Sequence, residues 1–263
     1  NKALLRCGAA IDEVNCVRKH LSAIKGGRLA AACAPARVVT LAISDVPGDE
    51  LSTIGSGPTV ADPTTLADAM SVLERYEIEP PPTVAAALRE ERNESPKPGH
   101  AGLAPGETFL IATPQTALEA AAEVARRSGV TPFILSDRIE GQAREVAKTH
   151  AALARRVATS CKPVAPPAVV LSGGEVTVTV RGDGRGGPNL EYLLALAIAL
   201  DGQSEVHALA VDTDGRDGTA DAAGATVGPA VLSRAGALHL DPQSHLRRND
   251  SYTFFERLES LVV

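Results

Sequence analysis

Aromatic residues are scarce in this sequence: Phe, Tyr and Trp together make up 3% of its 263 residues, and there is no tryptophan. Proteins that bind single-stranded nucleic acid stack bases on aromatic side chains, and proteins that bind duplexes carry blocks of Lys and Arg. This chain has no such block, and its formal net charge is −6. We therefore expect neither nucleic acid nor an anionic membrane surface to be a main partner.

Cysteine is also rare, and long apolar runs are missing. The four cysteines, Cys7, Cys16, Cys33 and Cys161, include no C-x-x-C pair, which argues against a zinc ribbon or a disulfide framework and favours reduced thiols in a cytoplasmic protein. No apolar run approaches the roughly 18 residues that a membrane-spanning helix needs. The first ten residues lack the apolar segment of a signal peptide.

What the chain does contain is the composition of a globular protein, with 44% hydrophobic and 22% charged residues. Short apolar runs that suit strands recur, and helix-like segments follow most of them, which predicts an α/β fold with mostly parallel sheets. These runs cover residues 38–44, 109–112, 132–135, 168–171 and 206–211.

Two further segments have patterns of their own. Residues 176–180 alternate Val and Thr, which predicts a half-exposed strand and favours antiparallel pairing. Residues 190–200 are almost wholly apolar and predict a buried helix.

A stretch rich in Pro, Gly and charged residues, 90–106, interrupts the alternation and predicts a linker. We expect residues 1–95 to be the C-terminal part of an incomplete first α/β domain, residues 96–106 to be the linker, and residues 107–263 to form a second α/β domain. The chain begins without Met and ends on Leu261-Val262-Val263, so we expect both ends to be truncations.

Two loops after the strand at 38–44 combine residues that bind anions. Residues 44–49 (SDVPGD) and 54–59 (IGSGPT) offer glycines, hydroxyls and backbone N–H groups at a strand end, where ligands bind in parallel sheets. A long turn before a helix explains the same residues equally well. Lys25, which precedes two glycines, suits a helix C-terminus better than a phosphate site on local sequence alone.

The segment 182–187 (GDGRGG) matches G-x-G-x-x-G, the pattern of a dinucleotide-binding loop. The strand before it alternates instead of being uniformly apolar, and the first strand-end acid after it, Asp212, comes later than in such sites. We favour a hairpin-like loop that carries Arg185, Asn189 and Glu191 towards a cleft.

The segment 211–219 (VDTDGRDGT) concentrates three carboxylates at a strand end. Such a group could hold Mg²⁺ through oxygen ligands or take a proton from a hydroxyl group. The alternative is a polar Asp-Gly turn, in which Arg216 offsets the repulsion between the acids. We favour the functional interpretation. The chain has no G-x-S-x-G nucleophile motif and no H-x-x-x-H pair.

Six motifs occur in a fixed order along nearly the whole chain. They are VRKHLS (17–22) with KGG (25–27), SDVPGD (44–49) with GSGPT (55–59), LSGGE (171–175), GGPNLE (186–191), DTDG (212–215) and NDSY (249–252). This ordered set resembles the glycerate 2-kinase family of the MOFRL type, whose members are often labelled hydroxypyruvate reductase. The resemblance implies two α/β domains with an active site between them, and phosphorylation of the 2-hydroxyl of glycerate that depends on ATP and Mg²⁺.

The resemblance also assigns roles to residues of this chain by motif position. The expected catalytic residues are Lys25, Asp45 and Asp214, and the expected metal ligands are Asp214 and Asp217. Substrate would bind to Arg185, Asn189 and Glu191, and phosphates or nucleotide to Gly55, Ser56, Gly57, Pro58, Thr59, Gly173 and Gly174.

The chain departs from the family pattern in two places. Much of the first domain, including a lysine thought to take part in catalysis, has no counterpart here, and neither has the closing segment of the family. Pro188 stands where many members have arginine, so the arginine's anion-binding role would pass to Arg185 or Arg181.

Two other functions remain open from the sequence. An NAD(P)H-dependent hydroxypyruvate reductase would give the G-x-G-x-x-G match its usual meaning, and a small-molecule binding module without catalysis would explain the missing lysine. A homodimer is compatible with the sequence but not established by it.

Overall fold

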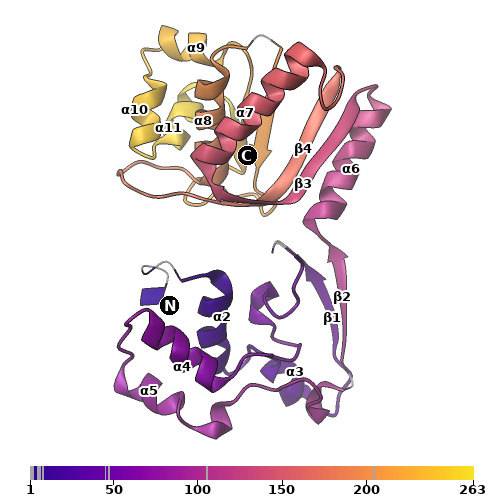
Figure 1. Cartoon of the computed structure of the whole chain (residues 1–263), viewed down its shortest axis with the longest axis vertical. Coiled ribbons are helices and arrows are strands. Elements are labelled where there is room, and N and C mark those ends of the chain that lie inside the picture. The colour runs from indigo at the N-terminus through magenta and orange to yellow at the C-terminus, as the bar shows by residue number, and fades with distance from the viewer. Residues whose placement is uncertain are drawn as a thin grey trace. The chain divides into compact units, whose positions relative to one another are not determined.

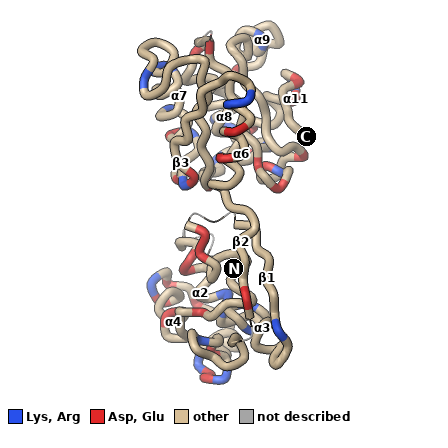
Figure 2. The backbone as a smooth tube through the Cα atoms, turned by 90° about the vertical axis from the view of Figure 1, so that its right-hand side faces the viewer, with Lys and Arg blue, Asp and Glu red and all other residues tan. Residues whose placement is uncertain are grey.

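A computed structural model of the chain describes residues 3–4, 7, 9–44, 46, 48–104, 106–203 and 205–263. The chain divides into two compact units, Asn1–Pro114 and Gln115–Val263 (Figure 1). Positive and negative residues are interspersed in both units (Figure 2). In the described ranges, no helix is both long and apolar enough to cross a membrane.

The first unit is built around two amphipathic helices. Helix α2 (Ile11–His20) packs on α4 (Leu66–Arg75), and Val14, Val17 and Leu73 lie in their shared core. Helix α4 begins where Thr65 accepts a hydrogen bond from the Asp68 N–H and the Asp68 carboxylate accepts one from the Thr65 N–H, a capping box that fixes the helix start. Shorter elements complete the unit: α3 (Arg28–Cys33), α5 (Pro82–Ala87) and the 3-10 helices η1 (Ile54–Ser56), η2 (Glu91–Asn93) and η3 (Ala101–Leu103).

Two parallel strands of the first unit confirm two of the predicted runs. Strand β1 (Val39–Ile43) pairs with β2 (Glu107–Ala112), with Val39 opposite Glu107. The sequence placed residues 107–112 in the second domain and the linker at 96–106, whereas β2 lies in the first unit with its partner.

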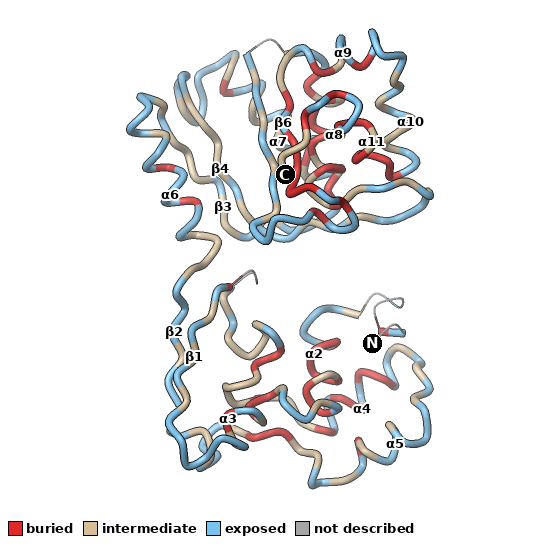
Figure 3. The backbone as a smooth tube through the Cα atoms, turned by 180° about the vertical axis from the view of Figure 1, so that it is seen from behind, coloured by how far each residue is buried: buried red, intermediate tan, exposed pale blue. Residues whose placement is uncertain are grey.

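The second unit contains two sheets and the larger core. Strands β3 (Thr131–Gln142) and β4 (Ala168–Thr177) are parallel, and β5 (Ala208–Val211), β6 (Gly224–Val227) and β7 (Leu261–Val262) form an antiparallel sheet. The apolar segment predicted as a buried helix is α8 (Pro188–Leu200), which lies in the core (Figure 3). The other helices are α6 (Pro114–Arg127), α7 (Ala143–Ser160), α9 (Val231–Ala237), α10 (Pro242–Arg247) and α11 (Ser251–Arg257).

The α/β class is confirmed, but strand direction differs from the prediction in two segments. Val176 and Thr177 continue β4 and pair in parallel with Gly141 and Gln142 of β3, and residues 178–180 lie outside any strand, so the predicted antiparallel strand at residues 176–180 does not form. An alternation of apolar and polar residues indicates that one face of a strand is exposed. It does not indicate whether the neighbouring strand is parallel or antiparallel. The antiparallel sheet lies instead at β5–β7, where the sequence predicted β5 and missed β6 and β7.

Candidate functional site

The glycine-rich loop of the second unit rests on the segment between α10 and α11. The side-chain Oδ1 of Asn249 accepts hydrogen bonds from the N–H groups of Arg181 (2.8 Å) and Gly182 (3.0 Å). Further along, the Tyr252 N–H donates to the Arg185 carbonyl at 3.0 Å. The segment 249–252 therefore fixes the position of the loop backbone at Arg185.

The glycines of this loop are explained by close packing against the chain itself. A Cβ added to Gly184 would lie 2.4 Å from the Cβ of Asp250, and one added to Gly187 would lie 2.3 Å from the carbonyl oxygen of Asp217. No side chain fits at such distances. The G-x-G-x-x-G match thus has a cause within the protein, and it needs no dinucleotide to account for it.

Two arginines converge on one carboxylate beside this loop. The Nη2 atoms of Arg185 and Arg216 lie 3.2 and 2.8 Å from the two carboxylate oxygens of Asp221. The Arg185 guanidinium also stacks over Tyr252, 4.3 Å from the ring centroid. All three charged side chains are exposed, so both guanidinium groups are accessible from solution. We call Arg185, Arg216 and Asp221 the arginine pair with its carboxylate.

The acidic turn after β5 lies next to this pair. The Asp212 carboxylate accepts a hydrogen bond from the Asp214 N–H at 3.2 Å, and the Asp214 carboxylate accepts one from the Arg216 N–H at 2.9 Å. Asp214 is exposed and Asp212 is half-buried. Each keeps oxygen lone pairs for a cation or a hydroxyl proton.

Asp217, in the same turn, is engaged in a different way. It is fully buried, and its two carboxylate oxygens accept hydrogen bonds from the N–H groups of Asn189 (2.9 Å) and Leu190 (2.8 Å) and from the Asn189 side chain (3.2 Å). Burial raises the pKa of this carboxyl above its usual range, although these hydrogen bonds oppose the change. Asp217 and Asn189, expected to bind metal and substrate, therefore hold each other at the start of α8.

Glu191, also expected to bind substrate, is buried among protein partners. Its carboxylate lies 2.7 Å from Nε of Arg144 on α7 and accepts a hydrogen bond from the Asn249 side-chain amide at 2.7 Å. Glu191 therefore links α8 to α7 and to the segment 249–252. Across the described ranges, no group of three or more His, Cys, Asp and Glu side chains is placed to hold a metal ion.

In the first unit, the structure brings Lys25 and the Gly55–Thr59 loop together. Lys25 Nζ donates a hydrogen bond to the Gly55 carbonyl at 2.9 Å, and the N–H groups of Gly26 and Gly27 donate to the carbonyls of Ser56 (3.0 Å) and Gly57 (2.7 Å). Two loops far apart in sequence are thus joined by their backbones. A cation lies beside the loop that was expected to bind phosphate.

Several groups of that loop are nevertheless already paired. The Ser56 hydroxyl is buried and donates to Asn15 Oδ1 at 2.8 Å, and the Thr59 hydroxyl accepts from Thr40 at 2.8 Å. The Pro58 carbonyl accepts from the Leu29 N–H at 3.1 Å. Asp45, expected to be catalytic, lies outside the described residues.

Gly173 and Gly174 lie within β4 instead of after it. A Cβ on Gly174 would lie 2.2 Å from the Ile139 carbonyl oxygen, and its φ is +142°, so this glycine allows β3 and β4 to approach closely. The expected phosphate contact of these two residues stays a prediction.

Comparison with known proteins agrees with the motif order. Residues 1–89 match a family model described as a domain of unknown function (DUF4147), and residues 168–263 match the MOFRL family. An Agrobacterium vitis protein named "Putative hydroxypyruvate reductase" is 50% identical over 267 residues, which cover 100% of this chain and 68% of that protein. The chain belongs to the glycerate 2-kinase family of the MOFRL type.

Two further comparisons, one with a protein sequence and one with a crystal structure, are with glycerate kinase from Thermotoga maritima. A protein named "D-glycerate 2-kinase" is 40% identical over 99% of this chain and 61% of its own length. A crystal structure of glycerate kinase aligns with a TM-score of 0.84 and 38% identity, covering 100% of this chain and 62% of that one. The chain thus spans about three fifths of the length of several relatives that it matches.

Sequence reasoning missed the buried polar network of the first unit. Lys19 Nζ lies 3.2 Å from an Asp62 oxygen, His20 Nε2 lies 2.9 Å from a Glu94 oxygen, and the Ser95 hydroxyl donates to Asp62 at 2.7 Å. These partners are 33 to 74 positions apart in the chain. No local spacing could have indicated them, since only the fold brings them together.

Proposed function

We propose that the protein is a glycerate 2-kinase, which transfers the γ-phosphoryl group of ATP to the 2-hydroxyl of glycerate. The observation that carries the proposal is the arginine pair with its carboxylate beside the acidic turn after β5. Phosphoryl transfer needs charge neutralisation and positioning more than covalent help from the protein. Family relatives named D-glycerate 2-kinase and glycerate kinase support the choice of substrate.

In this proposal, Arg185 and Arg216 bind the carboxylate of glycerate. Asp221 forms ion pairs with both guanidinium groups, which supports the proposal that the two groups can share one carboxylate; the glycerate carboxylate would take the place of Asp221. Planar guanidinium groups suit such paired recognition, since each offers several N–H donors in a fixed arrangement. Many family members have an arginine at the position of Pro188. In this proposal, Arg185 and Arg216 together take over the anion-binding role of that arginine.

The remaining roles follow the motif positions. Asp214 accepts the proton of the 2-hydroxyl or holds the metal, and Lys25 with the Gly55–Thr59 loop contacts phosphate groups. Asp45 is proposed as a further catalytic residue from its motif alone.

Magnesium fits the acidic turn in part. Mg²⁺ is commonly held by one or two carboxylates together with substrate phosphates and water, and Asp212 and Asp214 offer such oxygens. Asp217 does not fit, because backbone N–H groups occupy its carboxylate. When bound there, the ion would neutralise charge on the transferring phosphoryl group.

A hydroxypyruvate reductase is the second candidate, because a relative at 50% identity carries that name. The packing of Gly184 against Asp250 weighs against it, since the second glycine of a dinucleotide loop lets a pyrophosphate approach the backbone.

Variants of the arginine pair test the kinase proposal. Arg185→Gln and Arg216→Gln should each raise KM for glycerate about tenfold or more, because each removes a charge-assisted hydrogen bond. Arg126→Gln on α6 removes a similarly exposed arginine that pairs with Glu123, and it should leave KM unchanged. Unchanged KM in both variants of the pair would remove the main support for this site.

A further inference from the structure

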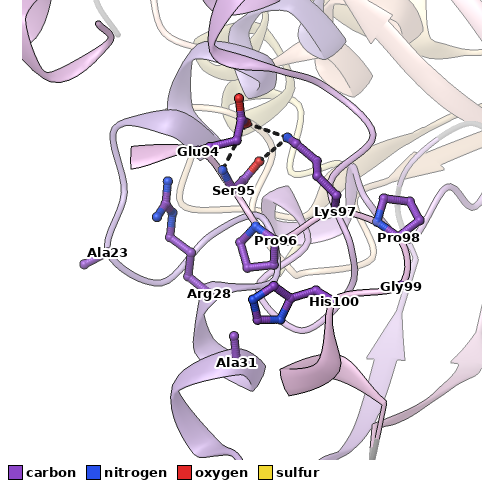
Figure 4. A pocket seen from close by; sticks show the side chains of 10 residues that line it. All are labelled: Ala23, Arg28, Ala31, Glu94, Ser95, Pro96, Lys97, Pro98, Gly99 and His100. Carbon is purple, nitrogen blue, oxygen red and sulfur yellow. Dashed lines mark hydrogen bonds and ion pairs between the residues drawn. The ribbon is translucent and has the colours of Figure 1, made fainter. Parts of the chain in front are cut away.

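A pocket of about 660 Å³ lies in the first unit (Figure 4). Its walls come from α3, from the segment between η2 and η3, and from the loop before α3. Its volume is in the range of small-molecule sites. The lining residues are Ala23, Arg28, Ala31, Glu94, Ser95, Pro96, Lys97, Pro98, Gly99 and His100. We call it the Arg28 pocket.

Arg28 brings an incompletely satisfied cation to this pocket. One terminal nitrogen donates a hydrogen bond to the Asn93 carbonyl, while Nε is buried and has no hydrogen-bond partner. Among the residues that the structure describes, no carboxylate forms an ion pair with Arg28. A buried donor without a partner costs free energy unless a ligand or water satisfies it.

His100 supplies a second donor to the same pocket. Its Nδ1 accepts a hydrogen bond from the Gly102 N–H at 3.1 Å. The neutral ring then carries its proton on Nε2 and donates from that atom. The side chain is exposed, so this donor is accessible from solution.

The one acid in the pocket wall does not compensate Arg28. The Glu94 carboxylate lies 2.6 Å from Lys97 Nζ and 2.9 Å from His20 Nε2, and it accepts a hydrogen bond from the Leu66 N–H at 3.0 Å. Its negative charge is therefore already neutralised, and the uncompensated charge at the pocket is the positive charge of Arg28.

The rest of the wall is largely apolar. Ala23, Ala31, Pro96 and Pro98 contribute alkyl surface, which favours a ligand with a short hydrocarbon body. A bare inorganic anion would leave this surface exposed to water.

We propose that the Arg28 pocket binds a small organic acid, whose carboxylate accepts hydrogen bonds from Arg28 and His100 and whose alkyl part packs on the alanines and prolines. This site lies in a different unit from the arginine pair with its carboxylate, and the inference does not depend on the proposed kinase activity.

Titrations with simple acids test the site. Acetate, butyrate and inorganic phosphate are added separately to ¹⁵N-labelled protein, and the backbone amide signals of Ala31, Gly99 and Gly102 report binding. We expect saturable shifts with butyrate, weaker binding of acetate because it has less apolar surface, and the weakest binding of phosphate.

Variants separate the site from a general charge effect. Arg28→Gln should weaken butyrate binding at least tenfold, and His100→Gln should weaken it severalfold. Arg89→Gln removes the same charge from an exposed position of the same unit outside the pocket and should leave binding unchanged. If Arg28→Gln does not fold, His100→Gln still decides the matter, because its side chain is exposed.

Three results would overturn the proposal: no saturable shift with butyrate, equal weakening in Arg28→Gln and Arg89→Gln, or tighter binding of phosphate than of butyrate. If the Arg28→Gln protein is unfolded, unchanged butyrate binding in His100→Gln would overturn it as well.

Discussion

Asp214 and Asp217 lie three positions apart in one turn, yet their carboxylates have opposite surroundings. Asp214 is exposed, while Asp217 is fully buried and holds the N–H groups at the start of α8. The sequence showed that acids gather here but could not say which of them faces solvent, because α8 determines that. The same limit applies to Glu191, which the motif assigns to substrate and the fold buries between Arg144 and Asn249.

Substitution of these two acids should therefore have different effects. Asp214→Asn should lower kcat/KM for glycerate about a hundredfold through loss of a base or metal ligand, with little change in stability. Asp217→Ala should lower the free energy of unfolding by about 2 kcal/mol or more, because buried N–H groups lose their acceptor. Turnover with and without added Mg²⁺ and urea denaturation measure the two effects. Asp214→Asn with normal turnover and normal Mg²⁺ dependence would refute its role.

Glu94 makes the first unit sensitive to acid. Lys97, the Leu66 N–H and His20 together lower the pKa of its carboxyl to about 2, although burial acts in the other direction. A folded-state pKa below the unfolded value of 4.5 means that the ionised form stabilises the fold. This contribution is complete above the unfolded pKa and is lost as the pH falls towards 2.

Glu94→Gln should therefore destabilise the protein at neutral pH and flatten the decline of stability between pH 4.5 and 2. Glu107→Gln, at an exposed ion pair with Arg37, provides the control. Urea denaturation at several pH values measures both variants. An unchanged acid profile in Glu94→Gln would show that this network does not govern acid sensitivity.

At the scale of elements, apolar runs predicted where most strands and the buried helix lie. The runs at 38–44, 109–112 and 206–211 became β1, β2 and β5, and 190–200 became most of α8. Strands β6 and β7 were missed because Gly224–Val227 is short and rich in small residues and Leu261–Val262 has two residues. Such segments become strands through pairing with β5 and with each other, which local propensity does not report.

The glycine-rich loop gives a prediction at this scale. Gly184→Ala should lower the free energy of unfolding by about 1–3 kcal/mol, because the added methyl group would overlap Asp250. Gly236→Ala in α9 adds the same group where nothing lies within 4 Å, and it should be neutral or stabilising by up to about 1 kcal/mol. Thermal or urea denaturation compares the two variants. Equal stability in both would show that the loop tolerates a side chain and would reopen the dinucleotide interpretation.

At the scale of the whole molecule, motif order was the strongest signal in the sequence. Six short motifs, each ambiguous alone, together indicated a family that the comparisons confirm. What they could not supply are the long-range contacts, such as the pairing of Lys19 with Asp62 and of Gly26 with Ser56. Such contacts form only when distant segments fold together, so the spacing of residues along the chain does not predict them.

Whether the protein phosphorylates glycerate is tested most directly by one measurement, the rate of ADP formation from ATP in the presence and absence of glycerate, made alongside NADH oxidation with hydroxypyruvate. We predict glycerate-dependent ADP formation, with the phosphoryl group on the 2-hydroxyl, and no oxidation of NADH. Oxidation of NADH by hydroxypyruvate without any glycerate-dependent ADP formation would contradict the kinase function.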